Sequence, residues 1–218
     1  MNSLLDVILP RRCGYCKTLI AALDGVFCQS CEAQLKPVTN FGERSLFIYA
    51  GILRQLILTA KFKPDESLSR VLARYLRQTL KRNSASLPFL HHEYTGVTYV
   101  PSHFRRRITR GHELPALLAV QIAKHLKIPF CHCLFAARFD PPLSAEPDAN
   151  TRSSRVADRY RVLKKIQSSH FLLVDDVSTT GATLNSAART LIDVGHTASL
   201  FTLAQTTLEK SNVCTTPL

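Results

Sequence analysis

The chain has 218 residues, of which 45% are hydrophobic, and its 28 Lys and Arg against 16 Asp and Glu give a formal net charge of +12. This length suits one medium domain with a small appendage, and an odd count of seven cysteines argues against a secreted disulfide framework. The basic balance favours polyanionic partners such as nucleic acid, although an ordinary basic protein has the same composition. Residues 1–10 lack a signal-peptide cleavage pattern, and no apolar run is long enough for a membrane span, so we expect a cytoplasmic protein.

Two Cys-x-x-Cys pairs, Cys13–Cys16 and Cys28–Cys31, lie eleven residues apart near the start of the chain. Each pair can place two thiolates on one metal ion, and two pairs complete a tetrahedral site for Zn²⁺. Four sulfur ligands leave no coordination position open, so we expect a structural zinc ion that supplies much of the folding free energy of this segment. A single pair is also a redox motif, but the presence of two favours metal binding. We interpret Cys131 and Cys133 as ordinary strand or loop residues.

Residues 46–82 are predicted to be largely helical. An apolar face recurs at helical spacing and is formed by Leu68, Val71, Leu72, Tyr75, Leu76 and Leu80. The opposite side carries a basic stripe of the same period, formed by Arg70, Arg74, Arg77 and Lys81. Such a stripe can contact the phosphates of a nucleic acid, and it is also typical of a solvated helix face.

From residue 95 onward, apolar strand patterns alternate with helical ones. Strands are predicted at 96–100, 171–174 and 198–204, and helices at 114–126 and 184–192, with Gly195 closing the second helix. The segments 101–107 and 138–165 are predicted to be loops. Strands alternating with helices indicate a parallel sheet with right-handed crossovers.

The most informative segment runs from Phe171 to Thr183, where two carboxylates follow a buried strand and a turn rich in hydroxyl groups leads into a helix. The carboxyl end of a strand is where open α/β sheets bind ligands, and a helix N-terminus attracts phosphate. Asp175 and Asp176 would repel a phosphate but suit the two hydroxyls of a ribose. The pattern therefore predicts a ligand with a 5′-phosphate at one end and a vicinal diol at the other.

This segment resembles the signature that binds 5-phosphoribosyl-1-pyrophosphate (PRPP) in type I phosphoribosyltransferases, with Ala182 in place of the usual second glycine. The resemblance implies an α/β fold in which a parallel sheet is flanked by helices, and it implies that Mg²⁺ accompanies PRPP. The expected PRPP-binding residues are Asp175, Asp176, Ser178, Thr179, Thr180, Gly181, Ala182 and Thr183.

Zinc pairs followed by this segment resemble the ComF/GntX family of competence-associated proteins. The likeness extends to Tyr49-Ala-Gly51, Lys61-Phe62, Val100-Pro101 and Arg110-Gly111. It implies a zinc-binding module at 1–40 and a phosphoribosyltransferase-like domain at 41–218, with a helical lead-in at 41–94 and the α/β core at 95–218.

Two departures from the family pattern stand out. The family usually continues Arg-Gly as Phe-Asn-Gln, whereas His112, Glu113 and Leu114 follow Gly111 here. Arg152-Ser-Ser-Arg155 stands where the family has Arg-x-x-Asn. These changes put in doubt any chemistry that depends on the missing amides.

The segment after the strand at 96–100 occupies the place of the pyrophosphate loop in the wider fold. Its arginines can pair with diphosphate oxygens or with a DNA backbone. Candidates for the diphosphate are Pro101, Ser102, His103, Arg105 and Arg107. Candidates for nucleic acid are Arg106 and Arg110, together with the basic stripe.

Three functions stay open on the sequence alone. The family resemblance and the charge favour a PRPP-binding protein that handles incoming single-stranded DNA during natural transformation. An active phosphoribosyltransferase would instead transfer phosphoribose to an amine or base, for which the sequence shows no acceptor pocket. An adaptor would dock on other DNA-uptake proteins through its zinc module.

Overall fold

In a computed structural model, residues 11–20, 25–42, 44–62, 66–137, 159–163 and 169–206 are described. Their centre is a five-stranded sheet in the order β1-β2-β7-β6-β3. The strands are β1 (Pro37–Gly42), β2 (Ser45–Ile48), β3 (Gly96–Tyr99), β6 (His170–Ser178) and β7 (Thr197–Gln205). All neighbouring strands are parallel except β1, which is antiparallel to β2.

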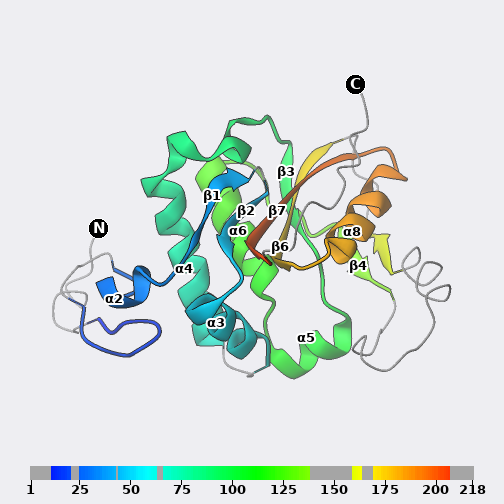
Figure 1. Ribbon diagram of the computed structural model, residues 1–218. Coiled ribbons are helices and arrows are strands. Elements are labelled where there is room, and N and C mark those ends of the chain that lie inside the picture. Colours follow the sequence, from blue (N-terminus) through cyan, green and yellow to red (C-terminus); the bar gives the residue numbers. More distant parts are fainter. Residues whose placement is uncertain are drawn as a thin grey trace.

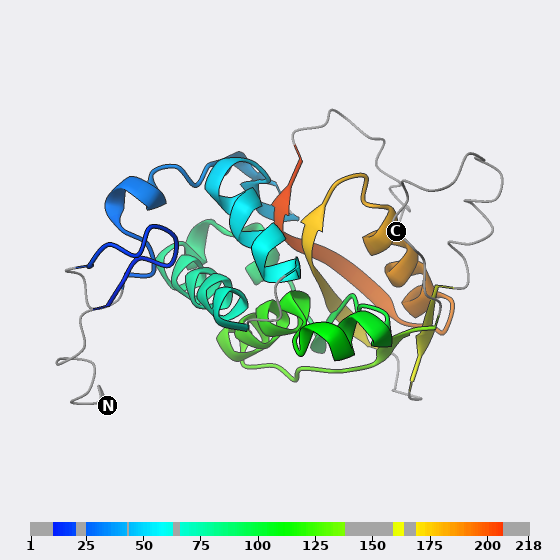
Figure 2. The ribbon, with the colours of Figure 1, turned by 90° about the horizontal axis from the view of Figure 1, so that it is seen from below.

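Helices cover both faces of this sheet (Figures 1 and 2). One face packs against α3 (Gly51–Phe62), α4 (Glu66–Arg82) and α6 (Leu114–Leu126). The other face packs against α8 (Ala182–Ile192) and a small antiparallel pair, β4 (Leu134–Ala136) and β5 (Tyr160–Val162). Alternate residues of β6 serve the two layers, since Leu172 and Val174 enter the first core while Phe171 and Leu173 enter the second. This architecture confirms the predicted α/β fold.

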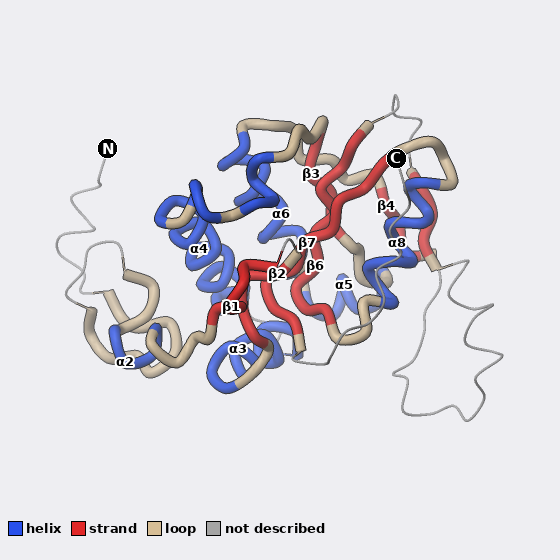
Figure 3. Tube along the Cα trace, turned by 45° about the horizontal axis from the view of Figure 1, so that its top comes forward, coloured by secondary structure: helices blue, strands red, loops and turns tan. Residues whose placement is uncertain are grey.

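The cysteine-rich segment packs against α4 and shares its core, and Figure 3 shows it at the end of the molecule beyond α4. Phe27 lies edge-on to Tyr75 of α4, with ring centroids 4.9 Å apart. A Cβ atom on Gly14 would lie 2.5 Å from Val71, so only glycine fits this approach. The short helix α2 (Gln29–Glu32) is tied to the end of α4 by an ion pair of 2.9 Å between Glu32 and Arg82.

The predicted helices at 114–126 and 184–192 and the three predicted strands are confirmed, although β6 continues to Ser178 and includes both aspartates. The strands β1 and β2 were missed, because four to six residues beside a helical pattern give no periodicity to detect.

The prediction of a loop at 101–107 was wrong beyond His103, because α5 (Phe104–Arg110) begins there. The Nδ1 of His103 accepts a hydrogen bond from the Arg105 amide at 3.4 Å, and Gly111 ends the helix with a φ of 72°. Arginine is a good helix former, so the basic run favours this helix.

Two short 3₁₀ helices, Ser84–Ser86 and Pro88–His91, connect α4 to β3. Among the described helices, none combines the length and the apolar character that crossing a membrane requires.

Candidate functional site

The carboxyl ends of β2, β3 and β6 meet at one edge of the sheet and open into a cleft of about 690 Å³. Segments far apart in the chain line this cleft. From the expected PRPP signature come Asp175, Asp176, Thr179 and Thr183. From the loop after β3 come Pro101, Ser102 and His103. The cleft therefore brings together the two loops that the sequence assigned to PRPP.

Asp175 and Asp176 are adjacent and both buried. Asp176 forms an ion pair of 2.8 Å with Nζ of Lys61, at the end of α3. Asp175 accepts a hydrogen bond of 2.8 Å from the backbone N–H of Asp176. Among the described residues, Asp176 forms an ion pair with a cation and Asp175 does not.

The electrostatics follow from this arrangement. Burial, and next the charge of Asp176, raise the pKa of Asp175 to about 8. Burial alone would lower the pKa of Lys61, but the Asp176 carboxylate outweighs it and raises that pKa above its ordinary value. The raised pKa therefore favours a protonated Asp175 at neutral pH, beside the ion pair of Asp176 with Lys61.

The turn after β6 leads into α8 through Gly181, which adopts a φ of 75°. The hydroxyl of Thr180 accepts a hydrogen bond of 3.4 Å from the Ala182 amide. The Thr206 hydroxyl, just after β7, donates a hydrogen bond of 3.2 Å to the carbonyl of Thr179. These contacts hold the turn at the mouth of the cleft, with unpaired N–H groups of the first turn of α8 beside it.

The loop after β3 is held by Glu113, whose side chain is 5% exposed. Its Oε1 accepts a hydrogen bond of 2.6 Å from the Ser102 amide, and its Oε2 accepts one of 2.9 Å from the Tyr99 hydroxyl. His112 beside it makes a 3.0 Å hydrogen bond with the carbonyl of Ala60. His112 and Glu113 thus fasten the cleft wall to α3 and β3.

The other predicted residues do not line the cavity or are not described. Ser178 ends β6, Thr180 and Gly181 lie in the turn after it and Ala182 begins α8, and none of the four lines the cavity. Arg105 and Arg107 lie on α5 and are exposed. The side chains of Arg106 and Arg110, and the whole segment Arg152–Arg155, lie outside the described part of the structure.

Sequence reasoning missed Lys61 and Glu113 as site residues. Lys61 belongs to one of the short motifs on which the sequence resemblance was based, but nothing in its spacing points to an aspartate more than a hundred residues away. Glu113 precedes a helix with a proline in its first turn, where an acidic residue is ordinary.

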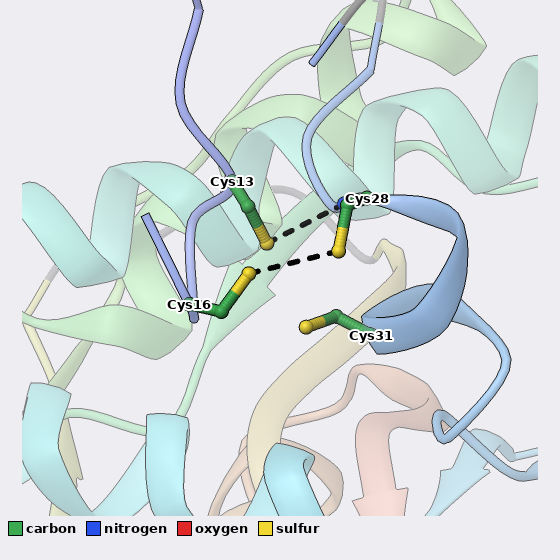
Figure 4. Close-up of side chains that lie close together, drawn as sticks. All are labelled: Cys13, Cys16, Cys28 and Cys31. Atoms are coloured by element: carbon green, nitrogen blue, oxygen red, sulfur yellow. Dashed lines mark hydrogen bonds between the residues drawn. The ribbon is translucent and has the colours of Figure 1, made fainter. Parts of the chain in front are cut away.

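The four cysteines of the two pairs form a second site, and Figure 4 shows their sulfur atoms pointing toward one another. All four sulfurs lie within 4.8 Å of each other, and those of Cys16 and Cys28 are 3.6 Å apart. Sulfurs bound tetrahedrally to zinc at about 2.3 Å are separated by roughly 3.8 Å, so the cluster fits this ion.

The thiols of this cluster differ in their acidity. A hydrogen bond with the Thr18 hydroxyl lowers the pKa of Cys16 to about 6, which favours the thiolate that binds metal. Burial, followed by the neighbouring thiols, raises the pKa of Cys31 to about 12. A zinc ion deprotonates the thiols that coordinate it, so its binding would release the Cys31 proton.

The basic stripe forms as predicted, because Arg70, Arg74, Arg77 and Lys81 are all exposed along α4. Arg70 makes an ion pair of 2.8 Å with Glu66, one helical turn earlier. Three of the four cations therefore have no ion pair with an acidic side chain among the described residues.

Residues 116–216 match a family model described as a phosphoribosyl transferase domain. This stretch contains the acid pair, the turn and α8. The match covers just under half of the chain, and this stretch is similar to phosphoribosyl transferase domains. The four-cysteine cluster, Lys61 and the loop after β3 all precede it.

Solved phosphoribosyltransferase structures resemble the chain at low sequence identity. A glutamine PRPP amidotransferase from B. subtilis, complexed with ADP and GMP, is 20% identical, with a TM-score of 0.40 over 60% of this chain and 26% of that one. An adenine phosphoribosyltransferase from Thermoanaerobacter pseudethanolicus is 12% identical, with a TM-score of 0.42 over 81% and 87% of the two chains. That of Trypanosoma brucei is 15% identical, with a TM-score of 0.41 over 79% and 86%. This chain thus spans about a quarter of the amidotransferase. No curated protein matches it.

The raised pKa of Asp175 makes the stability of this domain depend on pH. The folded protein keeps a proton that the unfolded chain releases near the ordinary value of 3.8, so wild-type stability falls as pH rises and this contribution is lost once pH passes about 8. Asp175→Asn keeps an acceptor for the Asp176 amide and has no proton to lose. Urea unfolding should show the variant gaining more than about 1 kcal/mol on wild type between pH 5 and pH 8.5. Asp193→Asn, which alters an exposed carboxylate after α8, should follow wild type. A difference between Asp175→Asn and wild type that is constant with pH would contradict this account.

The cysteine cluster predicts about one zinc ion per chain. Cys28→Ser should lose the ion and lower the thermal midpoint, because Cys31 and Phe27 belong to the core shared with α4. Cys131→Ser alters a partly buried thiol outside the cluster and should retain the ion. Metal analysis by mass spectrometry, on protein prepared without chelators, measures both variants. A wild-type protein free of zinc, or equal loss in both variants, would rule out the site.

Proposed function

We propose that the chain binds PRPP in the cleft between β3 and β6. The observation that carries this proposal is that the acid pair, the turn before α8 and the loop after β3 border one cavity. The carboxylates are acceptors for a ribose diol, and the hydroxyls of Thr179 and Thr183 stand beside a helix N-terminus that attracts phosphate. The loop after β3 lies within reach of a diphosphate on the anomeric carbon.

The charge of the cleft suits such a ligand. Lys61 already neutralises Asp176, and the raised pKa of Asp175 favours its protonated form at neutral pH. The anionic ligand therefore meets less negative charge than two bare carboxylates would present. The carboxylate oxygens are also hard ligands of the kind that Mg²⁺ prefers, and this ion supplies charge neutralisation at the diphosphate when bound.

The biological setting that we propose is the one implied by the ComF/GntX resemblance. The protein handles incoming single-stranded DNA in the cytoplasm during natural transformation, with PRPP as its ligand or regulator. The four-cysteine cluster packed on α4 and the basic stripe on the same helix support this assignment. The alternative is an active phosphoribosyltransferase acting on an unidentified amine or base.

Binding of PRPP tests the proposed site directly. Asp175→Ala with Asp176→Ala should weaken binding at least tenfold by isothermal titration calorimetry with Mg²⁺, because the diol loses both acceptors. Asp193→Ala is the matched control, since α8 separates this exposed acid from the cleft by about 16 Å of helix. Unchanged affinity in the double variant, with circular dichroism showing an intact fold, would place the ligand elsewhere. Release of pyrophosphate from PRPP in the presence of amines or bases would favour the enzyme over the binding protein.

The DNA hypothesis predicts binding that weakens steeply with salt and varies little with sequence. Arg74→Gln with Arg77→Gln should reduce the slope of log affinity against log salt by about two units and leave PRPP affinity unchanged. Arg161→Gln with Arg189→Gln removes the same charge from β5 and α8 on the other face of the sheet, so the slope should stay as in wild type. Fluorescence anisotropy with labelled single strands measures each slope. No binding at low salt, or equal effects of the two pairs, would reject this surface.

A further inference from the structure

Glu113 connects three parts of the fold through one buried carboxylate. It immediately precedes α6, its Oε1 accepts the Ser102 amide at 2.6 Å and its Oε2 accepts the Tyr99 hydroxyl at 2.9 Å. Nη1 of Arg107 lies 4.0 Å from Oε2, and His132 contacts the same tyrosine hydroxyl at 3.3 Å. The last residue of β3, the loop that follows it and the start of α6 are thereby held by a single side chain.

These contacts decide the position of the loop relative to the acid pair. β3 pairs with β6 in a register that sets Tyr99 opposite Val174, and the Val100 amide donates a 2.9 Å hydrogen bond to the Val174 carbonyl. The loop therefore leaves the sheet beside Asp175. Among the described residues no hydrogen bond of the β3–β6 ladder lies beyond Val100, and Glu113 holds the Ser102 amide.

A hydrogen bond from an amide to a carboxylate is stronger than one between neutral groups. Since Ser102 and His103 are only partly buried, packing alone constrains them less than the strand before them. Loss of the carboxylate would leave the Tyr99 hydroxyl with His132 alone and would remove the hydrogen bond of the Ser102 amide, so the position of the loop would be less well defined.

We propose that Glu113 is the positioning residue that sets this loop for the diphosphate arm of the ligand, and so determines preference for PRPP over ribose 5-phosphate. The inference rests on the proposed PRPP function. The acid pair and the turn before α8 would hold the ribose and its 5′-phosphate in both ligands. Only PRPP extends a second anionic group from the anomeric carbon, so only PRPP depends on the loop that Glu113 holds.

The test compares the two ligands on the full-length, zinc-containing protein by isothermal titration calorimetry with Mg²⁺. Glu113→Ala should weaken PRPP binding about tenfold and change ribose 5-phosphate binding by less than about twofold. Glu113→Gln should restore most of the PRPP affinity, because its carbonyl oxygen accepts the Ser102 amide and its NH₂ group donates to the Tyr99 oxygen. Tyr99→Phe removes one of the two bonds to Glu113 and should weaken PRPP selectively by a smaller factor, which keeps the test available if Glu113→Ala fails to fold.

The outcomes separate this inference from the proposal beneath it. Wild-type protein that binds neither ligand overturns both. Wild-type protein that binds PRPP, with variants that weaken the two ligands equally or not at all, overturns the positioning role and leaves the PRPP site in place. If Glu113→Gln binds PRPP as weakly as Glu113→Ala, the positioning role is also overturned, because restoring the hydrogen bonds would then not restore the affinity.

Discussion

Burial of two adjacent carboxylates at the end of the central strand is the constraint on which this structure depends. An unpaired buried charge is costly, so each carboxylate has to be matched or neutralised. Asp176 forms an ion pair of 2.8 Å with Lys61. Asp175 accepts a hydrogen bond from a backbone N–H, and its raised pKa favours the neutral acid. The end of α3 must therefore reach the carboxyl edge of the sheet, which places a helix from the first third of the chain against a motif from the last third.

The fold was predictable where apolar residues recur with the period of a helix or a strand. The apolar face of α4, the helix at 114–126 and the buried core of β6 each produce a pattern that packing then satisfies. The same cannot be said of β1 and β2, because strands of four to six residues gain their stability from neighbours and not from their own sequence. The helix at 104–110 was not predicted, because the proline and serine before it suggested that the whole segment is a loop.

Some residues of the candidate site were also predictable from the sequence, and others were not. The acids and the turn before α8 were predictable because one local segment carries their chemistry. Lys61 and Glu113 act through contacts with Asp176 and Ser102, which are distant in sequence or formed by backbone atoms. The cysteine cluster differs from Lys61 and Glu113, because the spacing of Cys13, Cys16, Cys28 and Cys31 in the sequence was enough to predict it. The spacing did not indicate that the cysteine-rich segment shares a core with α4.

The boundary of the family match runs through the cleft. Residues 116–216 contain the acid pair and α8. Lys61, the loop after β3 and Glu113 precede that boundary, yet they line the same cleft. Lys61 pairs with Asp176, and Glu113 holds the Ser102 amide. Side chains from outside the matched stretch therefore set the charge beside the acid pair and the position of the loop after β3. The side chains of His112 and Glu113 are buried in that wall, so a substitution at either position changes the cleft and not the surface.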